Sequence, residues 1–257
     1  MTRTKDTTQG IRDNSLRPYA LVAGIGYAVL FFLAIFANFF VREGLIVAGD
    51  AAQTAANIRG AEPLFRLGLV SFLAVFLIDV AVAWGLYVLF GAVDRNLSLL
   101  AAWFRVVYTV FLGVALIFFF QALQLLGGSG FLSAFSADQL NTQAMVALDS
   151  FNSTWLIGLV AFGVHLVLIG TLIIKSGRAP KVLGWFLIAS GLSYIFDTTA
   201  HSLLADYEKY ATLLLVIVAA PSVVAEGWFG LWLLLRGGKP AANASAAAGT
   251  EAPQNGG

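Results

Sequence analysis

Six long apolar runs, separated by short polar segments, dominate the pattern of this chain. A helix of about twenty apolar residues is long enough to cross the roughly 30 Å hydrocarbon core of a bilayer, so each run predicts a membrane-spanning helix. The predicted spans are Tyr19 to Val41, Leu67 to Phe90, Leu99 to Leu125, Phe151 to Ile174, Val182 to Leu204 and Ala211 to Leu235. We therefore predict an all-α, polytopic membrane protein built as a six-transmembrane-helix bundle.

The predicted bundle divides the chain into three parts. Residues 1–18 form a polar N-terminal segment, residues 19–236 form the six-helix transmembrane domain, and residues 237–257 form a tail rich in Ala, Gly, Asn and Pro. A segment of that composition cannot bury enough apolar surface to fold, so the tail is expected to be disordered.

Two loops on one side of the predicted bundle are long enough to hold short helices. In the first outer loop, Asp50 can cap a helix over residues 51–58, which a glycine and a proline then end. In the second, Ser136 and Gln139 have the spacing of a capping box, and apolar residues recur after them at helical intervals. This second helix is expected to lie on the membrane surface or to extend the fourth span outward. It could serve as a lid or as an ordinary connection.

Composition supports a membrane domain and excludes several classes of function. Hydrophobic residues make up 59% of the chain and charged residues 11%, whereas a soluble domain has about 25% charged residues. The chain has no cysteine, which excludes disulfides, thiolate catalysis and thiolate metal sites. The net charge of +1, with basic residues in short loops, provides no cationic face for nucleic acid.

Lys and Arg residues concentrate on one side of the predicted bundle. Ten of the fifteen lie in the two tails or in the connectors after the second and fourth spans, namely Arg3, Lys5, Arg12, Arg17, Arg95, Lys175, Arg178, Lys181, Arg236 and Lys239. Four lie on the opposite side, namely Arg42, Arg59, Arg66 and Lys209. Because short cytoplasmic loops carry the excess of basic residues, this bias predicts that both termini are cytoplasmic.

Ionisable side chains inside the predicted spans are the candidates for chemistry, because a charge there costs on the order of 3 kcal/mol and seldom persists without a partner or a role. They are Asp79, Arg105, His165, Asp197 and Glu226, and all except Arg105 are expected near the middle of the membrane. Asp79 and Arg105 lie on neighbouring helices joined by a short loop. The long Arg105 side chain could extend to the cytoplasmic interface or reach Asp79. We expect the ion pair with Asp79, which can be a structural clamp as readily as part of a site.

The fifth span carries a polar stripe. Ser190, Tyr194, Asp197 and His201 follow one another at intervals of four, three and four residues, which places them on one helix face. That face is expected to turn away from lipid and to meet His165 of the fourth span.

The sixth span has a second polar face, with Ser222 and Glu226, and Pro221 lies one position before it. Proline removes a backbone donor and frees a carbonyl, so a helix kink is expected at Pro221. Such kinks form ion sites in some transporters, and they also occur without a function.

Several segments resemble one family. They are Val41 to Ile58, Leu64 to Gly68, Leu86 to Leu89 with Asp94 and Arg95, and Gly191 to Tyr194 with Asp197. In these segments the chain resembles the bacterial membrane family named Domain of Unknown Function 4386, and the resemblance extends from about residue 17 to residue 236. It implies a multi-pass protein of a prokaryotic inner (plasma) membrane. It implies no activity and no catalytic residues.

Two functions are favoured by the pattern of polar residues. In the first, Asp79, His165, Tyr194, Asp197 and Glu226 line a polar mid-membrane cavity that binds a small ligand or relays protons, as in a transporter or a sensor. In the second, the protein is a structural membrane scaffold or partner subunit without its own chemistry, and its polar residues only hold helices together.

An intramembrane metal-dependent hydrolase is a weaker third hypothesis, with His165, Asp197 and His201 as ligands. The two histidines are expected at heights about 14 Å apart, too far for metal bonds of about 2 Å. No phosphate-binding loop or nucleophile motif is present, so an enzyme is not favoured and no cofactor or resident metal is expected. The expected partner is the lipid bilayer, with a small ligand or protons under the first hypothesis. The oligomeric state stays open.

Overall fold

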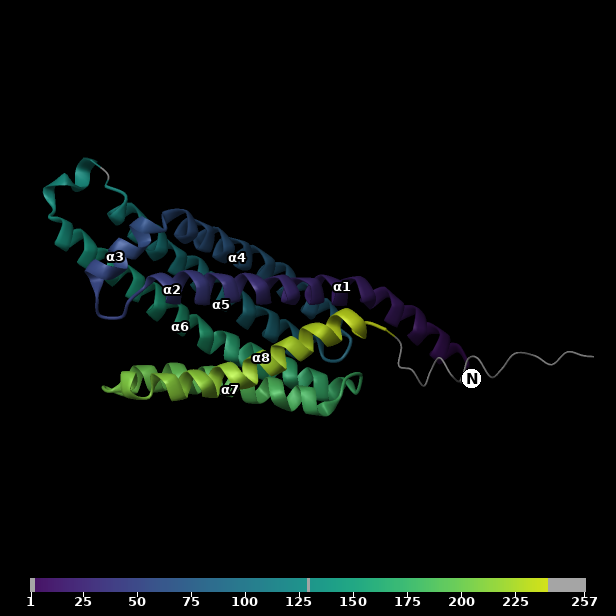
Figure 1. Ribbon diagram of the computed structural model, residues 1–257. Helices are drawn as coiled ribbons and strands as arrows, with labels where there is room; N and C mark the ends of the chain where they lie inside the picture. The colour runs from purple at the N-terminus through teal and green to yellow at the C-terminus, as the bar shows by residue number, and fades with distance from the viewer. Residues whose placement is uncertain (1–2, 129, 240–257) are drawn as a thin grey trace, which may run out of the picture.

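The all-α prediction is confirmed by the computed structural model (Figure 1). The structure describes the backbone of residues 3–128 and 130–239, and the side chains of these residues except 3–15 and 208. Most of the tail that was predicted to be disordered, residues 240–257, therefore lies outside the described residues. No strand occurs in the described ranges.

Six helices within the described residues are long and apolar enough to span a membrane. Along the chain, the elements are α1 (Arg3–Ile35), the π-helix η1 (Phe36–Arg42), α2 (Glu43–Leu45), α3 (Ala51–Gly60), α4 (Glu62–Gly91), α5 (Arg95–Leu126), the 3-10 helix η2 (Gly130–Ala134), α6 (Ala137–Ser176), α7 (Lys181–Leu203), the 3-10 helix η3 (Tyr207–Lys209) and α8 (Ala211–Leu235). The spanning helices are α1 continued by η1 and α2, then α4, α5, α6, α7 and α8.

The spanning helices form a closed ring. Each packs against the next one along the chain. The connections after α4 and α6 are only a few residues long, which makes α4 and α5, and likewise α6 and α7, antiparallel neighbours. Helix α8 also packs against α1, which closes the ring. Both described chain ends lie at the same end of the bundle, together with the α4–α5 and α6–α7 turns (Figure 1). We call this the terminal end, and the opposite one the outer end.

Glycines bring the backbones of α6 and α7 into close contact. A Cβ atom added to Gly163 would lie 2.5 Å from the carbonyl oxygen of Gly191, and one added to Gly184 would lie 2.6 Å from that of Gly170. Small residues at such crossings allow tight packing between membrane helices, where the hydrophobic effect provides no driving force. The two glycine pairs therefore fix how closely α7 approaches α6.

Replacing Gly184 with leucine is expected to separate α6 from α7 and to lower the free energy of unfolding by about 1–3 kcal/mol, the usual cost of overpacking. Denaturant unfolding in detergent micelles would measure the effect. Gly227→Leu is the matched control, because a Cβ atom at Gly227 meets nothing within 4 Å. Equal losses in the two variants would contradict the close crossing.

The outer end extends well beyond a bilayer. Helix α6 has 40 residues, so it is about 60 Å long, roughly twice the thickness of the hydrocarbon core. The predicted capping box is present, since Ser136 and Gln139 exchange both hydrogen bonds, but the helix it starts is continuous with the fourth span. The second outer loop thus extends this span outward, and its described residues also form the short η2.

The predicted helix of the first outer loop is α3, which packs against the outward extension of α6 (Figure 1). Asp50 caps it by accepting a hydrogen bond from the Gln53 N–H at 2.8 Å. Asn57 donates to the Leu45 carbonyl at 3.1 Å, and Arg59 donates to the Asn141 side chain at 2.9 Å. These contacts attach α3 both to the end of the first span and to α6.

At the terminal end, Asp94 links two helices. Its carboxylate caps α5 by accepting from the Leu97 N–H at 3.1 Å, and it forms an ion pair with Lys175 at 2.7 Å. The hydrogen bond from Lys175, followed by that from Leu97, lowers the pKa of Asp94 below its usual value. The pair joins the start of α5 to the end of α6.

Candidate intramembrane polar site

Arg105 is the centre of a buried polar network in the bundle interior. Its side chain is 2% exposed, and it reaches residues on three other helices. It forms an ion pair with Asp79 of α4, to which Nε donates at 2.9 Å and Nη2 also donates. Nη1 donates to the Tyr27 hydroxyl of α1 at 2.8 Å and contacts His165 Nε2 of α6 at 3.2 Å. One side chain of α5 therefore ties four spanning helices together.

The contacts of His165 define its tautomer. Its Nδ1 lies 2.8 Å from the Ala101 carbonyl oxygen, which can only accept a hydrogen bond. Its Nε2 faces the Arg105 guanidinium, which can only donate. The ring is therefore neutral, with the proton on Nδ1 and the lone pair of Nε2 directed to Arg105. Both nitrogens of His165 have partners within the protein.

Two aromatic rings face the guanidinium group. The Arg105 Cζ atom lies 4.8 Å from the centre of the Tyr27 ring and 5.4 Å from that of the Phe162 ring. A desolvated cation over an aromatic face gains about 2 kcal/mol. The rings and Asp79 together stabilise a positive charge that would otherwise be very costly inside the bundle.

The local sequence explains why Asp79 and Arg105 meet. Asp79 lies twelve residues before the end of α4 and Arg105 lies ten residues after the start of α5. The two helices are antiparallel neighbours, so these distances from the turn place the side chains at similar heights, about 18 Å and 15 Å from it. A third residue, Tyr27, reaches the same height from α1.

A second polar group lies between α7 and α8. The Tyr194 hydroxyl donates to Glu226 Oε1 at 3.1 Å, and the Ser190 and Ser222 hydroxyls are 2.9 Å apart. The Tyr194 ring meets Phe162 edge to face at 5.6 Å, and the centre of the Phe162 ring lies 5.4 Å from Arg105 Cζ. This group therefore borders the Arg105 network, although none of the described hydrogen bonds joins the two.

Asp197 and His201 have their described partner near the connection between α7 and α8, not in the Arg105 network. Asp197 accepts a hydrogen bond from the Tyr207 hydroxyl at 2.8 Å, and the His201 ring packs edge to face on Tyr207 at 4.4 Å. Asp197 is only six residues from the end of α7, where the connection to α8 provides a closer partner than the bundle interior. The polar stripe of α7 is thus divided between two environments.

The candidates do not form a metal centre in the part of the chain that the structure describes, where no group of three or more His, Asp or Glu side chains could hold an ion. His165 lies in the Arg105 network, whereas Asp197 and His201 are at the outer end of α7.

Pro221, the position of the predicted kink, lies inside α8, and the helix continues past it without interruption.

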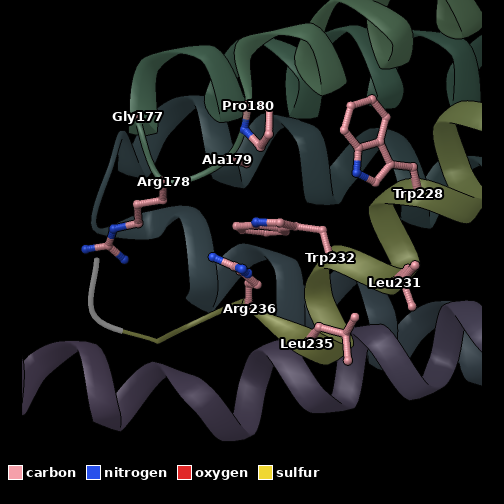
Figure 2. Close-up of a pocket in the computed structure, with 9 residues that line it drawn as sticks. All are labelled: Gly177, Arg178, Ala179, Pro180, Trp228, Leu231, Trp232, Leu235 and Arg236. Carbon is pink, nitrogen blue, oxygen red and sulfur yellow. The ribbon is translucent and has the colours of Figure 1, made fainter. Parts of the chain in front are cut away.

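Two surface pockets can be compared with the predicted mid-membrane cavity. One has a volume of about 480 Å³ and lies between the α6–α7 turn and the C-terminal part of α8 (Figure 2). The other, of about 320 Å³, lies between the apolar faces of α4 and α5. Neither pocket is lined by a residue of the candidate site.

The sequence-based reasoning missed Tyr27 and Phe162. Tyr27 is 6% exposed and lies on the same face of the first span as the fully buried Ala20 and Ala23. A tyrosine on the small-residue face of a membrane helix needs a partner for its hydroxyl, which was the available signal. Phe162 gave no comparable signal, because an aromatic residue in a membrane span usually packs against its neighbours without a specific polar partner.

Six apolar helices around a charge-paired polar core define a polytopic helical membrane protein. The chain belongs to the family described as Domain of unknown function (DUF4386), whose model matches residues 22–237. It is similar to an uncharacterized protein of Archaeoglobus fulgidus, with 29% identity over 171 residues that cover 66% of this chain and 84% of that protein. No solved structure matches the chain. The family resemblance seen in the sequence is confirmed, and neither description names an activity.

Proposed function

We propose that the protein is a scaffold or partner subunit of a prokaryotic plasma membrane, with both termini in the cytoplasm and no enzymatic chemistry of its own. The excess of basic residues at the terminal end supports this orientation, because that end holds Arg17, Arg95, Lys175, Lys181 and Arg236. The similarity to an archaeal protein supports a prokaryotic membrane.

The observation that supports the scaffold function best is the number of partners that Arg105 has inside the bundle. Four of its five N–H donors have partners, on three neighbouring helices, and the group is almost completely buried. A transport or ligand site needs polar groups that can exchange partners, whereas here Asp79, Tyr27 and His165 all face one fixed cation. Such a network is suited to holding helices in position.

Reconstitution into proteoliposomes tests this proposal. With a pH-sensitive dye inside the vesicles, we expect an imposed pH gradient to decay no faster than in protein-free vesicles. The neutral pair Asp79→Leu with Arg105→Met is expected to retain the helical fold and the elution volume of the wild-type protein, because a clamp can be replaced by apolar packing. Rapid proton flux in the wild-type protein that this double variant loses would overturn the scaffold function.

Glu226 favours a second candidate function, the binding of a small ligand or the relay of protons. Its described hydrogen-bond partner is the neutral Tyr194, so the carboxyl group can gain or lose a proton without breaking a direct ion pair. The Glu226 residue is half-buried, whereas Asp79 is buried. Proton flux that is abolished by Glu226→Gln and retained by Asp197→Asn would establish this function in place of the scaffold.

A further inference from the structure

The pocket at the terminal end combines positive charge with an apolar wall (Figure 2). Arg178 comes from the α6–α7 turn and Arg236 from the end of α8, so the lining of the pocket carries two guanidinium groups. Trp228, Trp232 and Leu231 of α8 supply aromatic and aliphatic surface. The site therefore favours a ligand with an anionic head and an apolar body.

The order of these residues along α8 matches the depth profile of a membrane surface. Arg236 follows the last residue of the helix, whereas Trp228 lies eight residues earlier and so about 12 Å deeper. Figure 2 shows Arg178 and Arg236 toward the turn, the Trp232 ring next to Arg236, and Trp228 and Leu231 farther along α8. Helices α6 and α8 both end here, and the ends of spanning helices are where lipid headgroups are expected.

The apolar part of the pocket faces the surface that lipid would cover. Leu231 is 54% exposed and Leu235 is 57% exposed, on the outward side of α8. Tryptophan rings prefer the membrane interface, where one edge is apolar and the other is hydrated. A ligand bound between the arginines could therefore continue along Leu231 into the acyl region without leaving the protein surface.

We propose that this pocket binds the headgroup of an anionic phospholipid, with Arg178 and Arg236 on the phosphate and the α8 face from Leu235 to Trp228 along the acyl chains. Guanidinium groups suit phosphate because they donate in a planar fork, and basic pockets at this membrane level bind anionic headgroups. A volume of about 480 Å³ exceeds what an inorganic phosphate ion fills. The bound lipid would connect the α6–α7 turn to the end of α8.

Native mass spectrometry of the detergent-purified protein tests the proposal, with phosphatidylglycerol and phosphatidylcholine supplied in equal amounts. We expect the wild-type protein to retain phosphatidylglycerol preferentially, and the Arg178→Gln/Arg236→Gln variant to bind it at least about tenfold more weakly, because each charge-assisted bond contributes strongly. Arg236→Gln alone should give a partial loss, and it serves if the double variant does not fold.

The matched control is Arg95→Gln, which removes an exposed charge at the same end of the bundle without touching the pocket. An equal loss in that variant would show that net charge, not this pocket, attracts the lipid, and would overturn the proposal. Inorganic phosphate at millimolar concentration should leave the bound phosphatidylglycerol in place. Its displacement by phosphate would identify a site for the free ion and would equally overturn the lipid assignment.

Discussion

Replacing Arg105 with methionine is expected to lower the free energy of unfolding by about 3–5 kcal/mol, the largest effect of any single substitution we propose. The change leaves the Asp79 carboxylate buried without a positive partner and removes the donors to Tyr27 and His165. Asp79→Leu should cost a similar amount, because it leaves the buried cation unpaired. Unfolding in mixed detergent micelles, followed by circular dichroism, would measure both variants.

Two comparisons make this prediction specific. In the double variant Asp79→Leu/Arg105→Met no charge remains, so most of the lost stability should return. Arg66→Met is the control for an ordinary ion pair, since Arg66 and Glu62 are exposed at the helix surface and such pairs contribute about 0–1 kcal/mol. If Arg105→Met were no more harmful than Arg66→Met, the network would not be a clamp.

Much of the fold could be predicted because membrane helices are specified by length and hydropathy, which are properties of local sequence. The pairing of Asp79 with Arg105 could also be anticipated. A short turn joins α4 to α5, so residues that are equally far from the turn on the two helices lie at similar heights. Asp50 and Ser136 marked helix starts for a similarly local reason, the need to satisfy free N–H groups.

The polar stripe of α7 shows where local sequence becomes insufficient. Ser190 and His201 share a helix face, but eleven residues separate them by about 16 Å along the axis. Over that distance the neighbours of the face change from Ser222 and Glu226 of α8 to Tyr207 of the α7–α8 connection. Helical spacing defines a face, whereas the tilt and position of neighbouring helices decide which partner each residue meets.

The three polar groups also explain why the scaffold function is favoured over a shared cavity. The Arg105 network, the Tyr194–Glu226 pair and the Asp197–Tyr207 pair each satisfy their polar atoms locally. A transport route would need these groups to exchange hydrogen-bond partners with one another within the membrane. Instead, each group forms its hydrogen bonds with nearby residues and stabilises one region of the fold. The Arg105 network stabilises the centre of the bundle, the Tyr194–Glu226 pair stabilises the contact between α7 and α8, and the Asp197–Tyr207 pair stabilises the outer end.

Arg17→Met is expected to lower the free energy of unfolding by about 2–3 kcal/mol, the largest effect outside the Arg105–Asp79 pair. Arg17 of α1 donates to the carbonyl oxygens of Leu233 at 3.0 Å and Gly237 at 2.8 Å, and also to that of Leu234. Carbonyls at a helix C-terminus have no donor within the helix, and a positive charge there is favoured by the helix dipole. Hydrogen bonds from a charged donor contribute about 1.5–3 kcal/mol.

The contact of Arg17 also closes the ring of helices, so its loss should act locally as well as on total stability. Hydrogen exchange of the last turn of α8 is expected to accelerate in Arg17→Met, while exchange in the centre of α5 stays slow, because Arg17 joins α8 only to α1. Arg95→Met provides the control, since it removes an exposed basic residue at the same end. If exchange in α8 were equally fast in both variants, Arg17 would not hold α8 against α1, and the closure of the ring would depend on apolar packing alone.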